Sequence, residues 1–173
     1  MTIGLKKGFI HSLIVVVLLL PELLGCHTSP EVTPGVDFPR FTSLKEAEDW
    51  CESNLRYEND DPWDRAPDLK SVFKDKHGDC KMLSGAVHEV LKSVGQESKI
   101  VTIETPAWHM FVIYKENENW RVINNGKLYK KVFASLDDIK AAYHVREFIH
   151  VSDSYDEFRS WFNNDIYPMK KGY

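Results

Sequence analysis

The segment from Asp79 to Gly95 constrains the fold most, because its apolar residues recur at intervals of three and four. These positions are Leu83, Ala86, Val87, Val90, Leu91 and Val94. Such spacing predicts a single amphipathic helix. Asp79 is a suitable N-cap for it, and Gly95 is a suitable stop. The segment is the most strongly periodic one in the chain.

Shorter helices are predicted before and after this segment, and strands follow it. Apolar spacing and capping residues predict helices over residues 43–57, 67–76, 135–143 and 154–162. Alternating or β-branched runs predict strands over residues 99–104, 109–114, 120–124 and 145–151. The two middle strands form a hairpin across the polar turn at residues 115–119. Helices first and a meander of strands later indicate an α+β fold, with helices packed on an antiparallel sheet.

The N-terminus resembles a bacterial lipoprotein signal peptide. Lys6 and Lys7 precede an apolar run from Phe9 to Leu20, which is shorter than the ~20 residues of a transmembrane helix. The run ends in Leu23-Leu24-Gly25-Cys26, which resembles the lipobox. This resemblance implies removal of residues 1–25 and lipid on Cys26; the alternative is an ordinary signal peptide or a short anchor. Residues 26–40, rich in proline, are a predicted flexible tether, and residues 41–173 are one domain.

Composition excludes several classes of function. The formal net charge of −4 gives no indication of nucleic-acid binding. No pair of histidines or cysteines has the spacing of zinc ligands, so no metal or other cofactor is expected. With Cys26 lipidated, the remaining cysteines are Cys51 and Cys80. Cys51 lies on the apolar side of the first predicted helix, where a small buried residue fits. We expect a monomer.

Cys80 is the candidate nucleophile. It directly follows Gly78-Asp79 and therefore begins the periodic helix. The first N–H groups of a helix are unpaired and its dipole is positive there, so we expect the thiolate to be favoured over the thiol. The alternative is a buried structural cysteine, but a capping position is unusual for one.

A thiol nucleophile needs a base and a group that orients the base. Among the histidines, His109 begins a strand after the bend at Pro106, Ala107 and Trp108. A turn near Asn117 places residue 124 or 125 opposite it, so Asn124 and Asn125 both qualify as the orienting group. The alternative for each asparagine is an ordinary turn residue.

These residues resemble the transglutaminase-like superfamily, and its bacterial cysteine proteinase branch in particular. The motifs are Gly78-Asp79-Cys80, Trp108-His109 and the run from Trp120 to Asn125, so the resemblance covers residues 55–128. It implies a papain-like core, with Cys80 as nucleophile, His109 as base and Asn124 where the family usually has Asp. Papain-like enzymes place an upstream Gln in the oxyanion hole, but the only glutamine is Gln96. Trp63 is the candidate donor, Tyr57 is the second, and loop packing is the alternative for Trp63.

The leading hypothesis is a cysteine peptidase or amidase that acts on exported or cell-envelope proteins or peptides through a thioester. An amine acceptor instead of water would give transglutaminase-type acyl transfer. A non-catalytic binding lipoprotein on a degenerate fold is the third reading, because Asn lacks the charge of Asp. The expected location is the cell envelope, on the outer membrane facing the periplasm if the host has one.

Overall fold

The structure is a computed structural model that describes residues 38–59, 64–106 and 108–168. The α-helices of these residues are α1 (Leu44–Asn54), α2 (Leu69–Asp75), α3 (Cys80–Ser93), α4 (Leu136–Ala142) and α5 (Tyr155–Trp161), and a π-helix, η1 (Phe162–Ile166), follows α5. The strands are β1 (Arg56–Tyr57), β2 (His77–Gly78), β3 (Ser98–Glu104), β4 (Trp108–Glu116), β5 (Asn119–Asn124), β6 (Lys127–Leu128) and β7 (His150–Ser152).

Five strands form one antiparallel sheet in the order β6-β5-β4-β3-β7. The pairing runs from Ser98↔Tyr114 to Glu104↔Trp108 between β3 and β4, and from Val112↔Ile123 to Glu116↔Asn119 between β4 and β5. The predicted α+β class with an antiparallel sheet is therefore confirmed, and its arrangement is that of a papain-like core.

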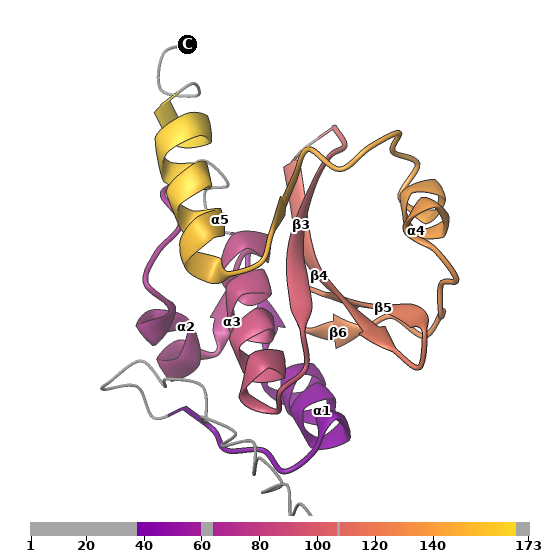
Figure 1. Ribbon diagram of the computed structural model, residues 1–173. Coiled ribbons are helices and arrows are strands. Elements are labelled where there is room, and N and C mark those ends of the chain that lie inside the picture. Colours follow the sequence, from indigo (N-terminus) through magenta and orange to yellow (C-terminus); the bar gives the residue numbers. More distant parts are fainter. Residues whose placement is uncertain (1–37, 60–63, 107, 169–173) are drawn as a thin grey trace, which may run out of the picture.

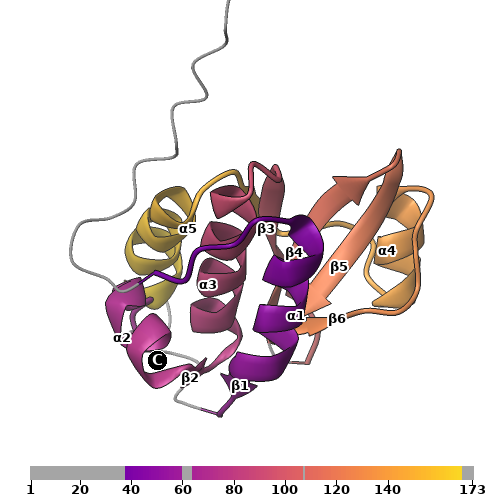
Figure 2. The same cartoon turned by 90° about the horizontal axis from the view of Figure 1, so that it is seen from below.

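The sheet separates two apolar clusters, as period-two alternation requires. Helices α1, α2, α3 and α5 cover one face of the sheet, and α4 covers the other face (Figure 1). Viewed from below, α5, α3 and α1 lie next to one another along the first face (Figure 2). Met110 belongs to the cluster under α3, whereas Phe111 belongs to the cluster under α4. The side chains of consecutive β4 residues thus lie on opposite faces of the sheet.

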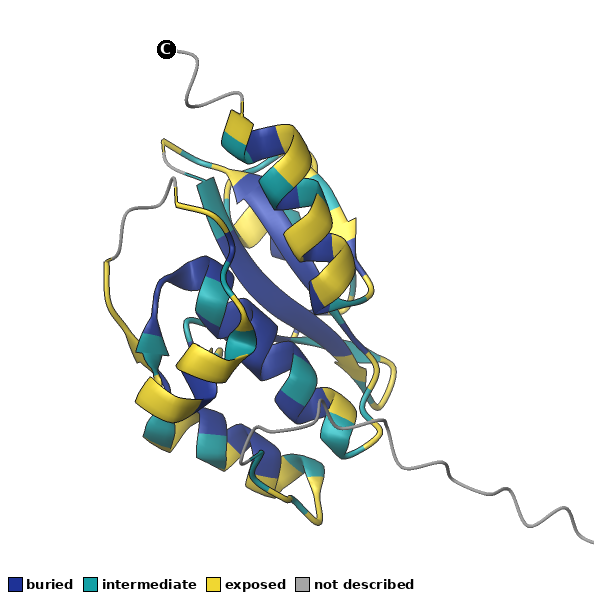
Figure 3. Cartoon of the chain, turned by 90° about the vertical axis from the view of Figure 1, so that its left-hand side faces the viewer, coloured by how far each residue is buried: buried dark blue, intermediate teal, exposed yellow. Residues whose placement is uncertain are grey.

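Helix α3 lies at the centre of the domain, between the sheet and the other helices. It is mostly buried, as are the middle strands, whereas the outer helices carry exposed faces (Figure 3). Gly85 permits the close approach of α5, because a Cβ there would collide with the Tyr155 ring and lie 2.8 Å from Leu69. The Tyr155 hydroxyl also donates to the Pro67 carbonyl at 2.8 Å. This packing fixes α3 between the sheet and the C-terminal helix.

Several predicted boundaries were wrong for identifiable reasons. Helix α1 ends at Asn54, not at Tyr57, because Arg56–Tyr57 pairs in parallel with His77–Gly78. The β4–β5 turn has two residues, Asn117 and Glu118, with φ of 49° and 66°, where we predicted about five. Strand β7 comprises only three residues, fewer than the predicted 145–151.

Phe38 and Phe41, at the start of the described residues, pack against the rest of the domain. The Phe38 ring lies 4.8 Å from that of Phe73, and the Phe41 ring lies 5.7 Å from that of Trp50. The predicted signal peptide and most of the tether lie outside the described residues. In the part of the chain that is described, no helix has the length and apolarity needed to cross a membrane.

Candidate active site

Cys80 is the first residue of α3, and its neighbours fix that helix start. The Asp79 carboxylate caps the helix by accepting the N–H groups of Lys81 at 2.9 Å and Met82 at 3.1 Å. Strand β2, directly upstream, pairs with β1 and thereby fixes the chain that enters the helix. Cys80 is 8% exposed. The nucleophile candidate is thus held by a capped helix and lies just beneath the surface.

The Cys80 sulfur lies against β4 at the point where β4 and β5 separate. It accepts a hydrogen bond from the Met110 backbone N–H, and its distance to the Met110 sulfur is 3.5 Å. The β4–β5 pairing ends at Val112 and Ile123, so Met110 has no β5 partner in that pairing. Because β5 does not pair with this end of β4, the start of α3 can pack beside Met110, the residue after His109.

His109 is joined to Asn124 by a hydrogen bond of 2.9 Å between Nε2 and Oδ1. Continuing the register by one step puts Asn124 opposite Phe111, two residues from His109, so the bond runs diagonally across one face of the sheet. Because an amide oxygen can only accept, Nε2 carries the proton in the neutral ring. Nδ1 is then the basic nitrogen, as a proton acceptor for a thiol requires.

The structure does not join all three predicted residues. His109 and Asn124 are hydrogen-bonded to each other, and the sulfur of Cys80 contacts Met110, the next residue along β4. Among the described residues, no hydrogen bond links the Cys80 sulfur to the His109 ring. The His109 ring instead faces the α4 side of the sheet, 6.1 Å from the ring of Phe111.

Tyr143 is a site residue that the sequence analysis missed. Its hydroxyl accepts a hydrogen bond from Asn124 Nδ2 at 3.2 Å, and its ring stacks on Phe111 at 4.4 Å. Tyr143 caps the C-terminus of α4, so this helix contributes to the site from the far face of the sheet. Tyr143 lies 19 residues from Asn124 in the sequence, and no local pattern joins the two.

A comparison with protein families matches residues 27–166 to the transglutaminase-like superfamily. The match covers most of the chain. The chain belongs to the transglutaminase-like superfamily. A search of curated proteins finds no match. Domains of this superfamily are usually cysteine peptidases or transglutaminases, and this superfamily supports a fold of cysteine-protease or acyltransferase type for the chain.

In this transglutaminase-like domain, burial favours the neutral forms of both candidate groups. Burial raises the pKa of the Cys80 thiol, and the Met110 backbone N–H opposes this only in part. Burial also lowers the pKa of the His109 imidazole, against the effect of the hydrogen bond to Asn124. Burial of Cys80 therefore acts against the thiolate that the helix start is expected to favour.

The other predicted candidates are placed as follows. Trp63 and Cys26 lie outside the described residues. Tyr57 lies on β1, opposite Gly78, and its hydroxyl donates to Asn59 at 3.2 Å. Asn125, the alternative to Asn124, adopts a φ of 49° in the β5–β6 turn and does not bond His109.

The two cysteines of the domain are not joined. Cys51 and Cys80 are both free and buried, which excludes a disulfide between them in this structure. Burial raises the pKa of Cys51 to about 12, as expected for a cysteine in the apolar core.

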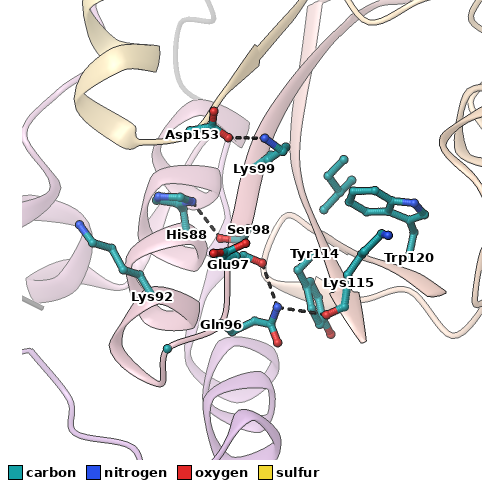
Figure 4. Close-up of a pocket in the computed structure, with 12 residues that line it drawn as sticks. His88, Lys92, Gln96, Glu97, Ser98, Lys99, Tyr114, Lys115, Trp120 and Asp153 are labelled. Carbon is teal, nitrogen blue, oxygen red and sulfur yellow. Dashed lines mark hydrogen bonds and ion pairs between the residues drawn. The ribbon is translucent and has the colours of Figure 1, made fainter. Parts of the chain in front are cut away.

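A groove of about 800 Å³ lies at the opposite end of α3 (Figure 4). His88, Lys92, Ser98 and Trp120 are among the residues that line it. His88 is eight residues beyond Cys80, or about 12 Å along the helix axis, so this groove is separate from the candidate active site. Within the described residues, no group of three or more His, Cys, Asp or Glu side chains is arranged to hold a metal ion.

Proposed function

We propose that this chain is a cysteine peptidase or amidase that cleaves exported or cell-envelope proteins or peptides through a thioester. The observation that carries the proposal is the hydrogen bond between His109 and Asn124, formed one residue from the backbone N–H that binds the Cys80 sulfur. A histidine held in one tautomer, on the strand that also contacts a thiol at a helix N-terminus, supports thiol acyl transfer.

The proposed reaction starts from a neutral thiol and a neutral imidazole. As the Cys80 sulfur attacks the substrate carbonyl carbon, its proton passes to His109 Nδ1, and the backbone N–H of Cys80 donates to the oxyanion. His109 returns the proton to the leaving amine when the carbon–nitrogen bond breaks, which leaves a thioester on Cys80. Water then attacks the thioester, His109 takes its proton, and the acid product leaves as the thiol is restored.

The same proposal includes anchoring through lipid on Cys26, with the domain exposed outside the cytoplasm. The lysines, apolar run and lipobox-like ending of residues 1–26 support it. Two or more acyl chains anchor a protein stably, whereas one does so only marginally. Metabolic labelling with an alkyne fatty acid tests the anchor: label on the wild type and none on Cys26→Ser is expected, and equal labelling of both contradicts it.

The catalytic proposal is tested by the alkylation rate of Cys80 at pH 7, followed by mass spectrometry of the Cys80 peptide. General-base assistance contributes about a hundredfold or more, so His109→Gln should slow the reaction of Cys80 by a large factor. Cys51 in the same sample is the internal control, since it lies on α1 and is fully buried. Equal Cys80 rates in the two proteins would refute the proposed base.

Acceptor choice separates hydrolysis from the alternative of acyl transfer. Incubation with a glutamine-containing protein and a fluorescent amine should release acid product and leave the protein unlabelled. Covalent incorporation of the amine that depends on Cys80 would instead establish a transglutaminase-type reaction.

One specific observation favours a non-catalytic role as the second candidate. Asn124 supplies no negative charge to His109, and burial holds both His109 and Cys80 toward their neutral forms. A lipoprotein that only binds a partner does not need an ionised cysteine or histidine. If the Cys80→Ala protein fully complements a deletion strain, the chain has the binding role and not the enzymatic one.

A further inference from the structure

Met110 contacts both the proton and the sulfur of the candidate nucleophile. The Cys80 S–H group donates to Met110 Sδ over a sulfur–sulfur distance of 3.5 Å. The Cys80 sulfur also accepts the backbone N–H groups of Met110 and Lys81. A thiol has one proton to donate, so in this structure the proton of Cys80 is directed at Met110 and not at His109. The proposed reaction does not use this contact.

The core fixes the position of the Met110 thioether. Met110 is 2% exposed and belongs to the cluster under α3, and Cys80 is 8% exposed. The preceding residue, His109, has its ring on the α4 face of the sheet, 6.1 Å from the ring of Phe111. The contact with Met110 therefore keeps the Cys80 proton on the face of the sheet opposite to the ring of the candidate base.

Filling the core does not by itself require a methionine at position 110. Methionine often fills irregular gaps in cores, but leucine has a similar volume and usually replaces it at small cost. What leucine lacks is a sulfur that can accept a hydrogen bond. An acceptor next to the thiol stabilises the protonated form, because a thiolate has no proton to donate. The thioether thus opposes the two backbone N–H groups, which favour the thiolate.

We propose that Met110 is a positioning residue, whose thioether holds the Cys80 thiol protonated and turned toward β4 until the thiol transfers its proton to His109. This inference rests on the proposed function, because the direction of the proton matters for the reaction only if His109 accepts it. The side chain of Cys80 must turn away from Met110 before the sulfur attacks the substrate. Met110 thereby makes the thiol of the free protein less reactive than a thiol with no acceptor beside it.

The test is the alkylation rate of Cys80 by iodoacetamide between pH 7 and pH 10, measured on the full chain in detergent by mass spectrometry. Met110→Leu removes the acceptor and should speed the reaction at pH 7 by about threefold, as expected for a weak hydrogen bond. This advantage should shrink as the pH rises, because the thiolate that then forms in both proteins has no proton for Met110. Asp79 and Lys81 both act on the Cys80 thiol, with opposite signs, and the substitution changes neither of them.

Met82→Leu is the matched control, because it is the same substitution in the first turn of the same helix, two residues after Cys80. The Met82 side chain also packs against the cluster under α3, so its replacement reports the effect of core packing alone. This control should leave the rate unchanged. A Met110→Leu rate equal to that of the wild type overturns the inference. An increase by the same factor at every pH overturns it too, since the substitution would then only open the core to the reagent.

The infrared S–H stretching band gives a second readout, which does not depend on the access of a reagent. The Cys80 band is identified by its loss in Cys80→Ala, and it should move to higher frequency in Met110→Leu because the hydrogen bond is removed. If Met110→Leu does not fold, the wild-type spectrum decides: a Cys80 band at the frequency of a thiol dissolved in an alkane overturns the inference. Failure of the proposed function has a different signature, since His109→Gln then leaves the alkylation rate unchanged while the Cys80 band keeps its lowered frequency.

Discussion

Asn124→Asp introduces the residue that the superfamily usually carries at this position. The variant tests whether the side chain of residue 124 determines the pKa of the His109 imidazole. The wild-type Nε2–Oδ1 distance of 2.9 Å would place a carboxylate against the imidazole with a charge separation of about 4 Å. At an effective dielectric constant of about 20, this separation gives about 4 kcal/mol of attraction. Both side chains are partly exposed, so solvent screening reduces this to about 2 kcal/mol, or roughly thirtyfold.

The sign of the effect follows from the charge. A carboxylate stabilises the imidazolium, so the pKa of His109 should rise, against the direction in which burial moves it in the wild type. The hydroxyl of Tyr143 can donate to the new carboxylate, which keeps the contact that Asn124 Nδ2 makes in the wild type. Cys80 alkylation at pH 7 should accelerate, because transfer of the thiol proton to His109 becomes more favourable.

The assay is an NMR titration of the His109 ring combined with the alkylation rate of Cys80. Asn125→Asp is the matched control, because it adds the same charge one residue away without a bond to His109. We expect Asn124→Asp to move the His109 midpoint upward by far more than Asn125→Asp does. Equal shifts of the midpoint in the two variants, or no shift in Asn124→Asp, would show that the hydrogen bond to residue 124 does not determine the pKa of His109.

Three further predictions follow from the same contacts. Burial lowers the pKa of His88 from 6.5 to about 4, so the unfolded chain binds a proton at higher pH than the folded chain, and stability should fall by about 2 kcal/mol between pH 7 and pH 4.5. Denaturant unfolding at these two pH values should show this loss in the wild type and not in His88→Gln. Tyr143→Phe removes one hydrogen bond to Asn124, which should cost about 1 kcal/mol and slow Cys80 alkylation; unchanged values for both would remove Tyr143 from the site. Gly85→Ala forces a methyl group against Tyr155 and should destabilise the domain by about 1–3 kcal/mol; Gly85→Ala combined with Tyr155→Leu should recover part of the loss in thermal unfolding.

The sequence predicted those parts of the fold that local patterns determine. Helix α3 occupies the predicted segment because its apolar spacing and its cap at Asp79 act together. Strand β6 was missed, although Asn125-Gly126 is the strongest short hairpin signal and both residues have positive φ. Parallel pairing of β1 with β2 could not be read from two-residue segments 20 residues apart, because neither has a pattern of its own.

The sequence indicated a contact between His109 and Asn124, but it did not give the register in which the two residues meet. The hairpin turn was assumed to place residue 124 or 125 opposite His109, whereas the two-residue turn places Asn124 two positions away. The bond to His109 still forms, because residues two apart on a strand share a face and a diagonal neighbour is within reach. The burial of Lys81 and the contact from Tyr143 depend on α5, η1 and α4, which are far away in the sequence.

The two halves of the candidate site meet through one peptide unit of β4. The Cys80 sulfur is held by the backbone N–H of Met110, and Met110 packs in the cluster under α3. His109 packs with Phe111 and Tyr143 on the face under α4. The candidate thiol therefore contacts β4 from one face of the sheet, whereas the candidate base projects from the other face. The distance between the Cys80 sulfur and the His109 ring depends on the path of β4 beyond Val112, where its pairing with β5 ends.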